Sequence, residues 1–417
     1  MIDFSGQVAV VTGAGRGLGR LFALDLARRG AKLVINDLGG SMGGDGADTS
    51  VADSVVQEIR ALGGSAVASH DSVATPEGAQ AIVRTALDSF GRVDAVVSNA
   101  GIFNSIAFEE LSVDDWRRML SVHLDGGFYL GQAAFRVMKQ QGYGRLVFIS
   151  SSAGVFGQPM EAHYAAAKTG LVGLTNVIAL EGAAHGIHAN SVLPFGFSRM
   201  VSETIANAGD GDSDGASHPF LQAIEPELVV PIVVYLASRD CRVTHQNYSA
   251  CAGRFARVFV GLAEGWLAKS GSRPSADDIA THIDAVSATA PFTIPESIFD
   301  EIGEVSARID AVSGAAASKE ERDQTFANER YSIDTKMALL LDDPSAKALL
   351  TKFIPEIETA GAMLKLARGM TLRKISGYPQ ARISPEKLQS IDVELAKLAP
   401  AAAVRPAIRR WWQFRSS

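Results

Sequence analysis

Residues 7–29 read QVAVVTGAGRGLGRLFALDLARR. Residues 7–11 are mostly apolar and typical of a buried strand, whereas residues 17–29 carry the apolar period of a helix. The glycine-rich turn TGAGRGLG, residues 12–19, therefore joins a strand to a helix. In this context a glycine pattern predicts a dinucleotide site, because the first amides of the helix face the phosphates.

Three of the four glycines of the turn have predicted roles. Gly13 allows a tight turn, Gly17 lets the backbone approach a pyrophosphate, and Gly19 permits close helix packing. Asp37 follows at the end of the next predicted strand, where a carboxylate accepts hydrogen bonds from ribose hydroxyls and repels a 2′-phosphate. Arg16 could pair with such a phosphate, but Asp37 acts directly at the discriminating position. The turn therefore predicts NAD rather than NADP.

Short apolar runs alternate with helical segments up to about residue 194. The predicted strands are residues 7–11, 32–36, 65–70, 93–98, 144–149 and 188–193. The predicted helices are residues 17–29, 49–62, 76–90, 113–140, 161–185 and 226–238. Residues 248–251 and 257–261 are predicted to add strands that close the sheet. This alternation predicts an α/β fold with a doubly wound, Rossmann-type parallel sheet and a small C-terminal helical appendage.

The predicted domains are residues 1–310, a polar linker at 311–330, and a small helical unit at 331–417. Within the last, Ser384, Pro385 and Glu386 predict a helix start with a capping serine, a proline at the first position and an acidic first turn. The basic, aromatic residues 409–415 are interpreted as a docking tail. Residues 207–217, rich in Gly, Asp and Ser, predict either a substrate lid or a surface insertion.

Composition excludes several classes of function. The formal charge of −7 argues against a nucleic-acid or anionic-membrane surface. Cys241 and Cys251 are the two cysteines, which fits a reducing compartment, and no cluster has metal-ligand spacing. We find neither a secretory signal nor a stretch long enough to span a membrane. The sequence predicts a cytoplasmic protein without a metal.

A catalytic constellation follows the glycine turn. Tyr164 and Lys168 lie four residues apart, on one face of a helix, and Ser151 lies thirteen residues before Tyr164. A nearby cation favours the phenolate, so Lys168 is expected to lower the pKa of Tyr164. With the glycine turn, these residues predict a nicotinamide-dependent oxidoreductase.

The motifs Thr12-Gly13-xxx-Gly17-x-Gly19, Asn99-Ala100-Gly101, Ser151 and Tyr164-xxx-Lys168 occur in this order. The chain thereby resembles the short-chain dehydrogenase/reductase family over about its first 200 residues. The segments 36–40, 70–73, 122–124, 198–200 and 261–266 further resemble the dehydrogenase part of the peroxisomal multifunctional enzyme type 2 family. Members of that family oxidise (3R)-hydroxyacyl-CoA esters and some hydroxysteroids with NAD.

The resemblance implies roles for individual residues. Tyr164 would be the acid/base, Lys168 would hold the nicotinamide ribose, and Ser151 would bind the substrate oxygen. Pro194 would begin the segment that passes the nicotinamide. The full cofactor-binding set would be Gly13, Arg16, Gly17, Leu18, Gly19, Asp37, Asp71, Ser72, Asn99, Ala100, Gly101, Tyr164, Lys168 and Pro194.

The chain departs from the family pattern at two places. His123 stands where the family usually has a catalytic asparagine, which acts through a helix kink and its backbone carbonyl. His123 is accordingly a candidate catalytic residue, with plain packing as the alternative. Phe195 follows Pro194 where many relatives have glycine, and with Phe197 it is expected to offer an apolar wall to the substrate.

The predicted reaction interconverts a secondary alcohol and a ketone on a hydrophobic substrate. The multifunctional enzyme family passes its thioester to a hydratase domain further along the chain. Here the region after the linker is too short for that domain, so a hydroxysteroid is favoured and a (3R)-hydroxyacyl-CoA ester is the alternative. A non-catalytic NAD sensor or scaffold is the alternative of another class. The resemblance also implies a homodimer or homotetramer, formed through the helices predicted at 113–140 and 161–185.

Overall fold

The computed structural model describes residues 2–196, 223–269, 271–312, 331–358, 370–376 and 383–398. The chain divides into two compact units, Met1–Phe259 and Val260–Ser417. The first unit contains the glycine turn and the predicted catalytic residues. Phe197, the segment 207–217, most of the predicted linker and the tail at 409–415 lie outside the described residues.

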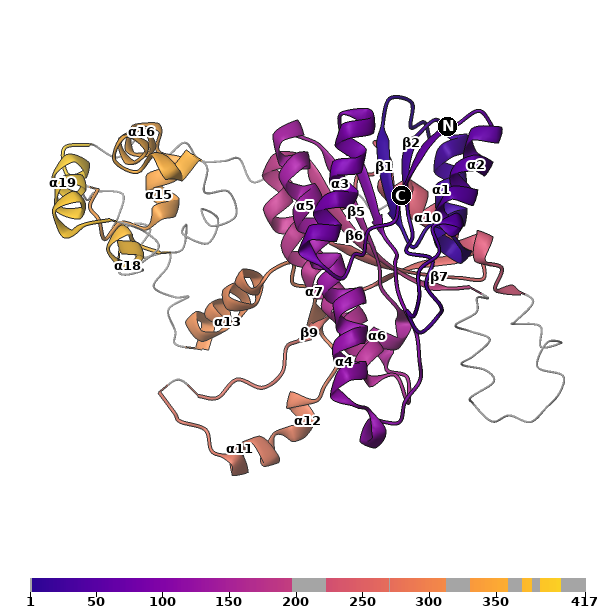
Figure 1. The fold of residues 1–417 in the computed structure, drawn as a ribbon. Coiled ribbons are helices and arrows are strands. Elements are labelled where there is room, and N and C mark those ends of the chain that lie inside the picture. Colours follow the sequence, from indigo (N-terminus) through magenta and orange to yellow (C-terminus); the bar gives the residue numbers. More distant parts are fainter. Residues whose placement is uncertain are drawn as a thin grey trace, which may run out of the picture. The chain divides into compact units, whose positions relative to one another are not determined.

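One eight-stranded sheet forms the centre of the first unit (Figure 1). Its strand order is β3-β2-β1-β4-β5-β6-β7-β8, with β1 to β7 parallel and β8 antiparallel to β7. The strands are β1 Val8–Thr12, β2 Lys32–Asn36, β3 Ser65–Ser69, β4 Ala95–Ser98, β5 Gly144–Ile149, β6 Ile187–Phe195, β7 Gln246–Cys251 and β8 Arg254–Val258. The predicted doubly wound parallel fold is confirmed.

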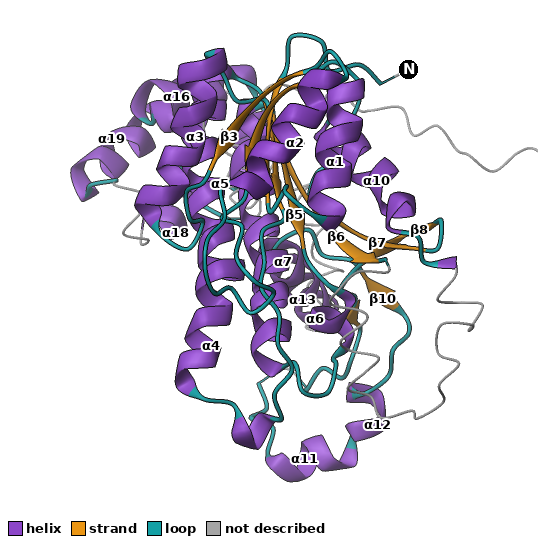
Figure 2. Cartoon of the chain, turned by 45° about the vertical axis from the view of Figure 1, so that its right-hand side comes forward, coloured by secondary structure: helices purple, strands orange, loops and turns teal. Residues whose placement is uncertain are grey.

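Helices cover both faces of this sheet (Figure 2). One face carries α1 Gly17–Arg28, α2 Ser50–Ala61 and α10 Val230–Ala237, the last preceded by a short helical turn at Pro226–Val229. The other carries α3 Pro76–Phe90, α5 Gly126–Gln141 and α7 Ala162–Gly182. Because side chains alternate along a strand, Ala9 and Val11 join the first core and Val8 and Val10 the second. The chain order brings the segments after β1, β2 and β4 together at one edge.

Residues 113–141 are helical throughout, so the helix predicted at 113–140 is confirmed, but its hydrogen-bonding pattern changes at the centre. The structure has α4 Val113–Leu120, a π-helical turn η2 at Ser121–Asp125, and then α5. The apolar period continues through the turn, which is why the sequence did not reveal it. His123 lies inside this turn and is buried. A π-turn admits an extra residue into the helix, and such turns are frequent at functional sites.

The last strand of the sheet begins three residues earlier than predicted, at Arg254 rather than at residue 257. Ala252 and Gly253 both have positive φ, 50° and 75°, and form a two-residue turn between Cys251 and Arg254. A tight turn of this kind matches the twist of an antiparallel pair, so pairing resumes at once.

A buried carboxylate joins β1 to the residues that precede β4. Asp94 is fully buried and accepts hydrogen bonds from the Val8 amide at 2.9 Å and from Arg92 Nε and Nη2, each at 2.7 Å. We expect Asp94→Ala to lower the free energy of unfolding by about 3 kcal/mol, because it leaves a buried amide without an acceptor. Urea unfolding of both proteins measures the loss; Asp88→Ala, on the adjoining helix α3, is the control. A loss below about 1 kcal/mol would contradict this role.

The second unit begins with a small two-stranded sheet and three helices. These are β9 Leu262–Ala263, β10 Phe292–Thr293, α11 Ala276–Thr281, α12 Ile283–Val286 and α13 Ile298–Val312. The ring of Trp266 stacks on that of His282, with centroids 4.1 Å apart. Between residues 260 and 309, no residue whose burial the structure describes is fully buried.

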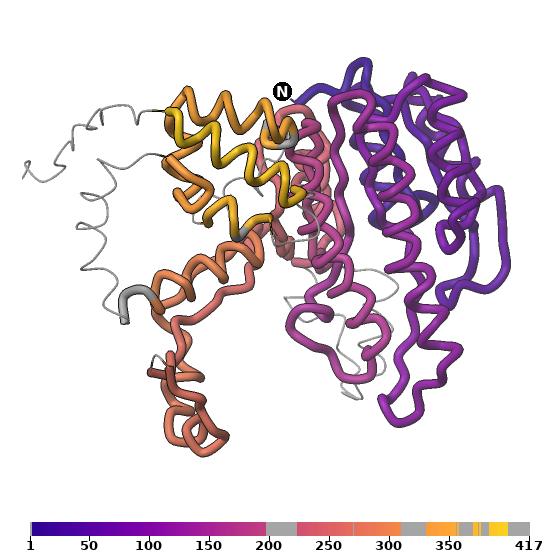
Figure 3. The backbone as a smooth tube through the Cα atoms, turned by 90° about the vertical axis from the view of Figure 1, so that its left-hand side faces the viewer, coloured from indigo at the N-terminus to yellow at the C-terminus, as the bar shows by residue number. Residues whose placement is uncertain are grey.

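Residues 331–398 have a hydrophobic core of their own. Its helices are α15 Met337–Asp342, α16 Pro344–Phe353, η7 Pro355–Glu358, α18 Leu372–Ser376 and α19 Pro385–Leu395. Helices α16 and α19 lie side by side (Figure 3). Ser384 Oγ caps α19 by accepting a hydrogen bond from the Lys387 amide at 3.2 Å, so the predicted helix start is confirmed. Across the described residues, no helix combines the length and apolarity needed to traverse a bilayer.

Candidate active site

A pocket of about 550 Å³ opens at the carboxyl ends of β1, β2 and β4. The strand order reverses beside β1, and such a switch point is where open α/β sheets bind ligands. Ten of the predicted cofactor residues line the pocket: Gly13, Arg16, Gly17, Leu18, Asp37, Asp71, Ser72, Asn99, Ala100 and Gly101. Gly19, Tyr164, Lys168 and Pro194 do not line it.

The glycine turn has backbone conformations and close contacts that a residue with a side chain would not tolerate. Gly13 and Gly17 have φ of +61° and +52°, a backbone conformation that other residues rarely adopt. A Cβ on Gly13 would lie 2.7 Å from Ala100 Cα, and one on Gly19 would lie 2.1 Å from the Gly13 oxygen. The turn therefore packs tightly against the loop after β4, as predicted for Gly19. Around Gly17, a Cβ would meet nothing within 4 Å, so this side is open for a ligand.

The two residues that bear on cofactor choice are both attached to the loop 38–48. Asp37 Oδ2 accepts a hydrogen bond from the Gly15 amide at 2.8 Å, and its Oδ1 accepts one from the Gly39 amide at 2.7 Å. Arg16 Nη1 donates to the Gly40 carbonyl at 3.4 Å. Asp37 thus has a fixed position in the pocket wall, whereas Arg16 is directed towards the loop.

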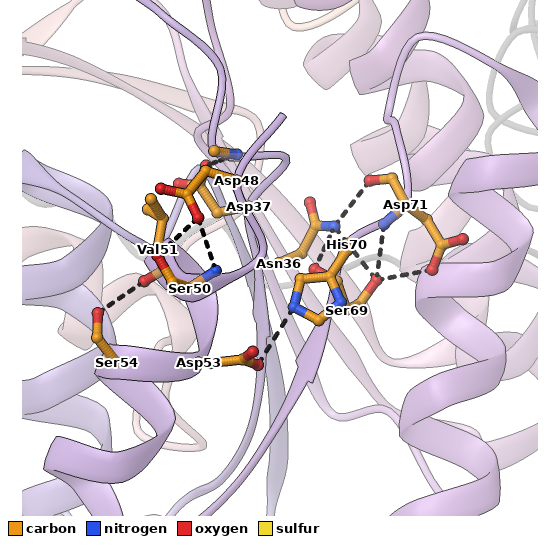
Figure 4. Close-up of polar contacts among 11 residues, drawn as sticks. Asn36, Asp37, Asp48, Ser50, Val51, Asp53, Ser54, Ser69, His70 and Asp71 are labelled. Carbon is orange, nitrogen blue, oxygen red and sulfur yellow. Dashed lines mark hydrogen bonds and ion pairs between the residues drawn. The ribbon is translucent and has the colours of Figure 1, made fainter. Parts of the chain in front are cut away.

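Asn36 is a site residue that the sequence prediction missed (Figure 4). Its buried Nδ2 donates to the Asp71 carbonyl at 2.9 Å and to the Ser69 carbonyl at 3.2 Å. Ser69 Oγ donates in turn to Asp71 Oδ2 at 3.0 Å. Together these bonds orient Asp71, which belongs to the predicted cofactor-binding set. A polar amide at the end of an apolar strand was the available signal.

Thr12 was also missed as a functional side chain. It is fully buried, and its Oγ1 accepts hydrogen bonds from the amides of Asn99 at 3.0 Å and Ala100 at 3.1 Å. Asn99 Nδ2 donates to the carbonyls of Thr12 at 3.0 Å and Gly13 at 3.1 Å. This reciprocal network holds the loop after β4 against the glycine turn.

The structure brings Ser151, Tyr164 and Lys168 together. Ser151 caps the short helix α6 Ser152–Phe156, and its hydroxyl is near enough to Tyr164 to act towards a lower pKa of the phenol. Lys168 Nζ lies 5.5 Å from the centroid of the Tyr164 ring and donates to the Ile149 carbonyl at 2.6 Å. Lys168 is therefore held at the end of β5, on the side of the ring that the four-residue spacing predicts.

The predicted lowering of the pKa of Tyr164 is not what the protein residues produce. Burial raises the pKa of Tyr164 to about 12, although the nearby Ser151 hydroxyl acts in the opposite direction. Burial also lowers the pKa of Lys168 to about 7, and that of the adjacent Glu161 rises to about 7 for the same reason. Desolvation disfavours every charged form here, and the sequence prediction considered only the attraction between neighbours.

His123 lies beside Tyr164, with ring centroids 5.2 Å apart and planes nearly perpendicular at 86°. Burial and then the Lys168 charge lower the pKa of His123 well below its usual value, so the imidazole is neutral. Gly101 is needed at its position, because a Cβ there would lie 2.3 Å from His123 Cε1. His123 therefore packs between the loop after β4 and the catalytic candidate.

Of the two phenylalanines predicted to contact the substrate, the structure describes Phe195 but not Phe197. Phe195 ends β6 and is 37% exposed, and the partly buried Pro194 precedes it in the same strand. No group of three or more His, Cys, Asp or Glu side chains among the described residues is arranged to hold a metal ion. Cys241 is buried, Cys251 is partly buried, and neither forms a disulfide.

A model of the short chain dehydrogenase family matches residues 7–208. A short-chain type dehydrogenase/reductase of Mycobacterium tuberculosis is 44% identical over 274 residues, which cover 66% of this chain and 91% of that protein. Peroxisomal multifunctional enzyme type 2 of Mus musculus is 39% identical over 301 residues, or 71% of this chain and 39% of that one.

The structure of full-length peroxisomal multifunctional enzyme type 2 from Drosophila melanogaster superposes with a TM-score of 0.60 at 30% identity. The match covers 74% of this chain and 50% of that chain, so this chain spans half or less of the length of the mouse and fly multifunctional enzymes. With the glycine turn, the Asn99 loop and the Ser151, Tyr164 and Lys168 cluster in place, the chain belongs to the short-chain dehydrogenase/reductase family of oxidoreductases.

Proposed function

We propose that the chain is an NAD-dependent dehydrogenase that oxidises a secondary alcohol on a hydrophobic substrate. The observation that supports this most directly is the grouping of Ser151, Tyr164 and the buried Lys168, whose Nζ lies 5.5 Å from the centroid of the Tyr164 ring. An acid/base group and a donor to the substrate oxygen are the protein groups that such a reaction needs.

NAD rather than NADP is the cofactor in this proposal. Asp37 lines the pocket and is fixed by two backbone amides, so a 2′-phosphate would meet a carboxylate that cannot easily move away. Arg16, which could have paired with that phosphate, is directed to the Gly40 carbonyl. The pocket residues fit a dinucleotide, since Gly17 leaves an open cradle at the start of α1.

Ser151, Tyr164 and Lys168 have separate roles in the proposed proton transfer. Ser151 donates a hydrogen bond to the substrate oxygen, and Tyr164 takes the proton of the alcohol. Lys168 supplies a donor next to the phenol while its Nζ remains bonded to the Ile149 carbonyl. A bound nicotinamide would supply the acceptor for the hydride of the carbinol carbon. Burial of Tyr164 and Lys168 excludes water from the transfer.

Two classes of substrate are the candidates. The relatives that are multifunctional enzymes favour a (3R)-hydroxyacyl thioester, because about 40% of residues are identical over the whole dehydrogenase region. A hydroxysteroid, which the sequence alone favoured, is supported by the apolar Phe195 at the end of β6.

A homodimer or homotetramer through α5 and α7 is part of the proposal, and Phe128, Val177 and Leu180 leave apolar side chains exposed on these helices.

The two directions of the reaction should differ in their pH dependence. Oxidation needs Tyr164 without its proton, and burial raises its pKa to about 12, so kcat/KM for oxidation should rise ~10-fold per pH unit above neutrality. Reduction uses the protonated phenol and should not rise. Initial rates in both directions between pH 6 and 10 measure this, and an oxidation rate that stays constant over the range would contradict it.

The function is tested by following NAD reduction with (3R)-hydroxyacyl-CoA esters, hydroxysteroids and simple secondary alcohols. Turnover that is lost in Tyr164→Phe would support the dehydrogenase, and the best substrate would decide between the two classes. NAD binding without turnover on any alcohol would instead favour the non-catalytic sensor.

A further inference from the structure

Three consecutive residues after Gly101 are each held by a different part of the first unit. The Ile102 carbonyl lies 2.7 Å from His123 Nε2, in the π-helical turn. The Phe103 amide donates to the Met42 carbonyl at 2.9 Å, in the loop 38–48. Asn104 Oδ1 lies 2.8 Å from His163 Nε2, on α7. Neither His163 nor Asn104 takes part in the proposed proton transfer.

Both imidazoles are held through Nε2. His163 Nε2 faces the Asn104 amide oxygen at 2.8 Å, and because that oxygen is an acceptor, this contact has its hydrogen on Nε2. His123 Nε2 faces both the Ile102 carbonyl at 2.7 Å and the Ile102 amide at 3.1 Å, so it either donates to the carbonyl or accepts from the amide, according to its tautomer. His123 is 3% exposed and His163 is fully buried, and burial lowers the pKa of both. Each is thus a neutral ring fixed at Nε2, with an Nδ1 that has no partner among the described residues.

The held segment encloses the ring of Tyr164. Phe103 meets this ring edge to face, with centroids 5.3 Å apart and planes at 88°, and His123 meets it similarly at 5.2 Å. Tyr164, Phe103 and Met119 form one buried apolar cluster, against which Met42 and Ile102 pack. The orientation of the phenol is therefore set by residues 102–104 as well as by its own helix.

The same segment is connected to the cofactor pocket. Met42 lines that pocket, as do its neighbours Gly40, Ser41 and Gly44. Arg118 on α4 forms an ion pair with Asp45 of the loop 38–48. A Cβ on Gly44 would lie 2.7 Å from Ile102 Cγ2, so the loop and the segment are closely packed.

We propose that residues 102–104, here named the 102–104 clip, position Tyr164 relative to the cofactor pocket, with His123 and His163 as anchors. His163 and Asn104 are positioning residues that act through Phe103 on the phenol. The inference rests on the proposed function, in which Tyr164 is the acid/base. Loosening the clip misplaces the hydroxyl without removing any group that binds the cofactor.

The anchors are tested with matched variants of His163. His163→Leu removes the donor to Asn104, and we expect kcat to fall about 10- to 100-fold with KM for NAD changed less than ~2-fold. His163→Gln retains an N–H donor and should recover most of kcat. The control is His188→Leu on β6, which removes another imidazole with a buried, unpartnered Nδ1 outside the site. Thermal unfolding of each variant separates misfolding from misplacement.

Asn104, the partly exposed partner of His163, offers a second test. Asn104→Ala should lower kcat like His163→Leu, Asn104→Asp should retain it by keeping an acceptor, and the combined Ala and Leu variant should lose no more than either alone. If wild type turns over and Tyr164→Phe does not, full kcat in His163→Leu and Asn104→Ala overturns the clip. The clip is also overturned if Gln at 163 is no better than Leu. An active Tyr164→Phe would instead overturn the proposed function.

Discussion

Replacing Tyr164 with phenylalanine is expected to lower kcat about 10³-fold, because the ring keeps its packing while the only proton-transfer group proposed at the substrate is removed. Phe103 and His123 contact the ring rather than the hydroxyl, so the cavity should keep its shape. Steady-state rates with the best alcohol of the panel measure kcat, and titration with NAD measures binding, which should be unchanged.

The control for this variant is Tyr235→Phe, which removes a hydroxyl from α10 away from the pocket residues. It should leave kcat within ~2-fold of wild type. A Tyr164→Phe enzyme that retains a tenth or more of the activity would contradict the assignment of Tyr164 as acid/base, since general acid–base catalysis contributes roughly 10²- to 10⁴-fold.

Replacing Asp37 with alanine is expected to lower the preference for NAD over NADP by about 10²-fold. The loss of hydrogen bonds from ribose hydroxyls to a charged acceptor weakens NAD by roughly 1.5–3 kcal/mol, and the repulsion of a 2′-phosphate disappears at the same time. The measured quantity is the ratio of kcat/KM for the two cofactors. Asp37 also orders the loop 38–48, but a loosened loop affects both cofactors and largely cancels in this ratio.

Asp53→Ala is the matched control, because it removes a negative charge from α2 without changing the pocket lining. The NAD preference should then stay within ~2-fold of wild type, since an exposed charge is largely screened. If Asp37→Ala leaves the ratio unchanged, the carboxylate does not select the cofactor, and Arg16 becomes the residue to test.

Much of the fold could be predicted because its signals are local. The strand, turn and helix at residues 7–29 each have a period or a glycine that reports its own backbone conformation, and the predicted sheet follows from short-range alternation. The π-helical turn at Ser121–Asp125 was not predictable in this way. It does not alter the apolar period, and it depends on how His123 packs against Gly101.

The candidate site likewise has features that the local sequence predicts and features that depend on the folded structure. The spacing of Tyr164 and Lys168 requires only helix geometry, and the two residues are indeed on one side of α7. The pKa of Tyr164 went the other way from the prediction, and that of Lys168 is lowered, because burial in the folded chain outweighs the attraction between neighbours. Spacing along a chain reports which groups are near each other, but it does not report how much water surrounds them.

By itself, the sequence determined the family, the parallel α/β sheet, the glycine turn and the identity of the catalytic candidates, because each rests on residues close together in the chain. Only the tertiary structure decided that Asn36 orients Asp71, that Arg16 is directed to Gly40, and that Phe103 packs edge to face on Tyr164. These contacts join residues that are distant in sequence, and their partners and burial are set when the layers pack together.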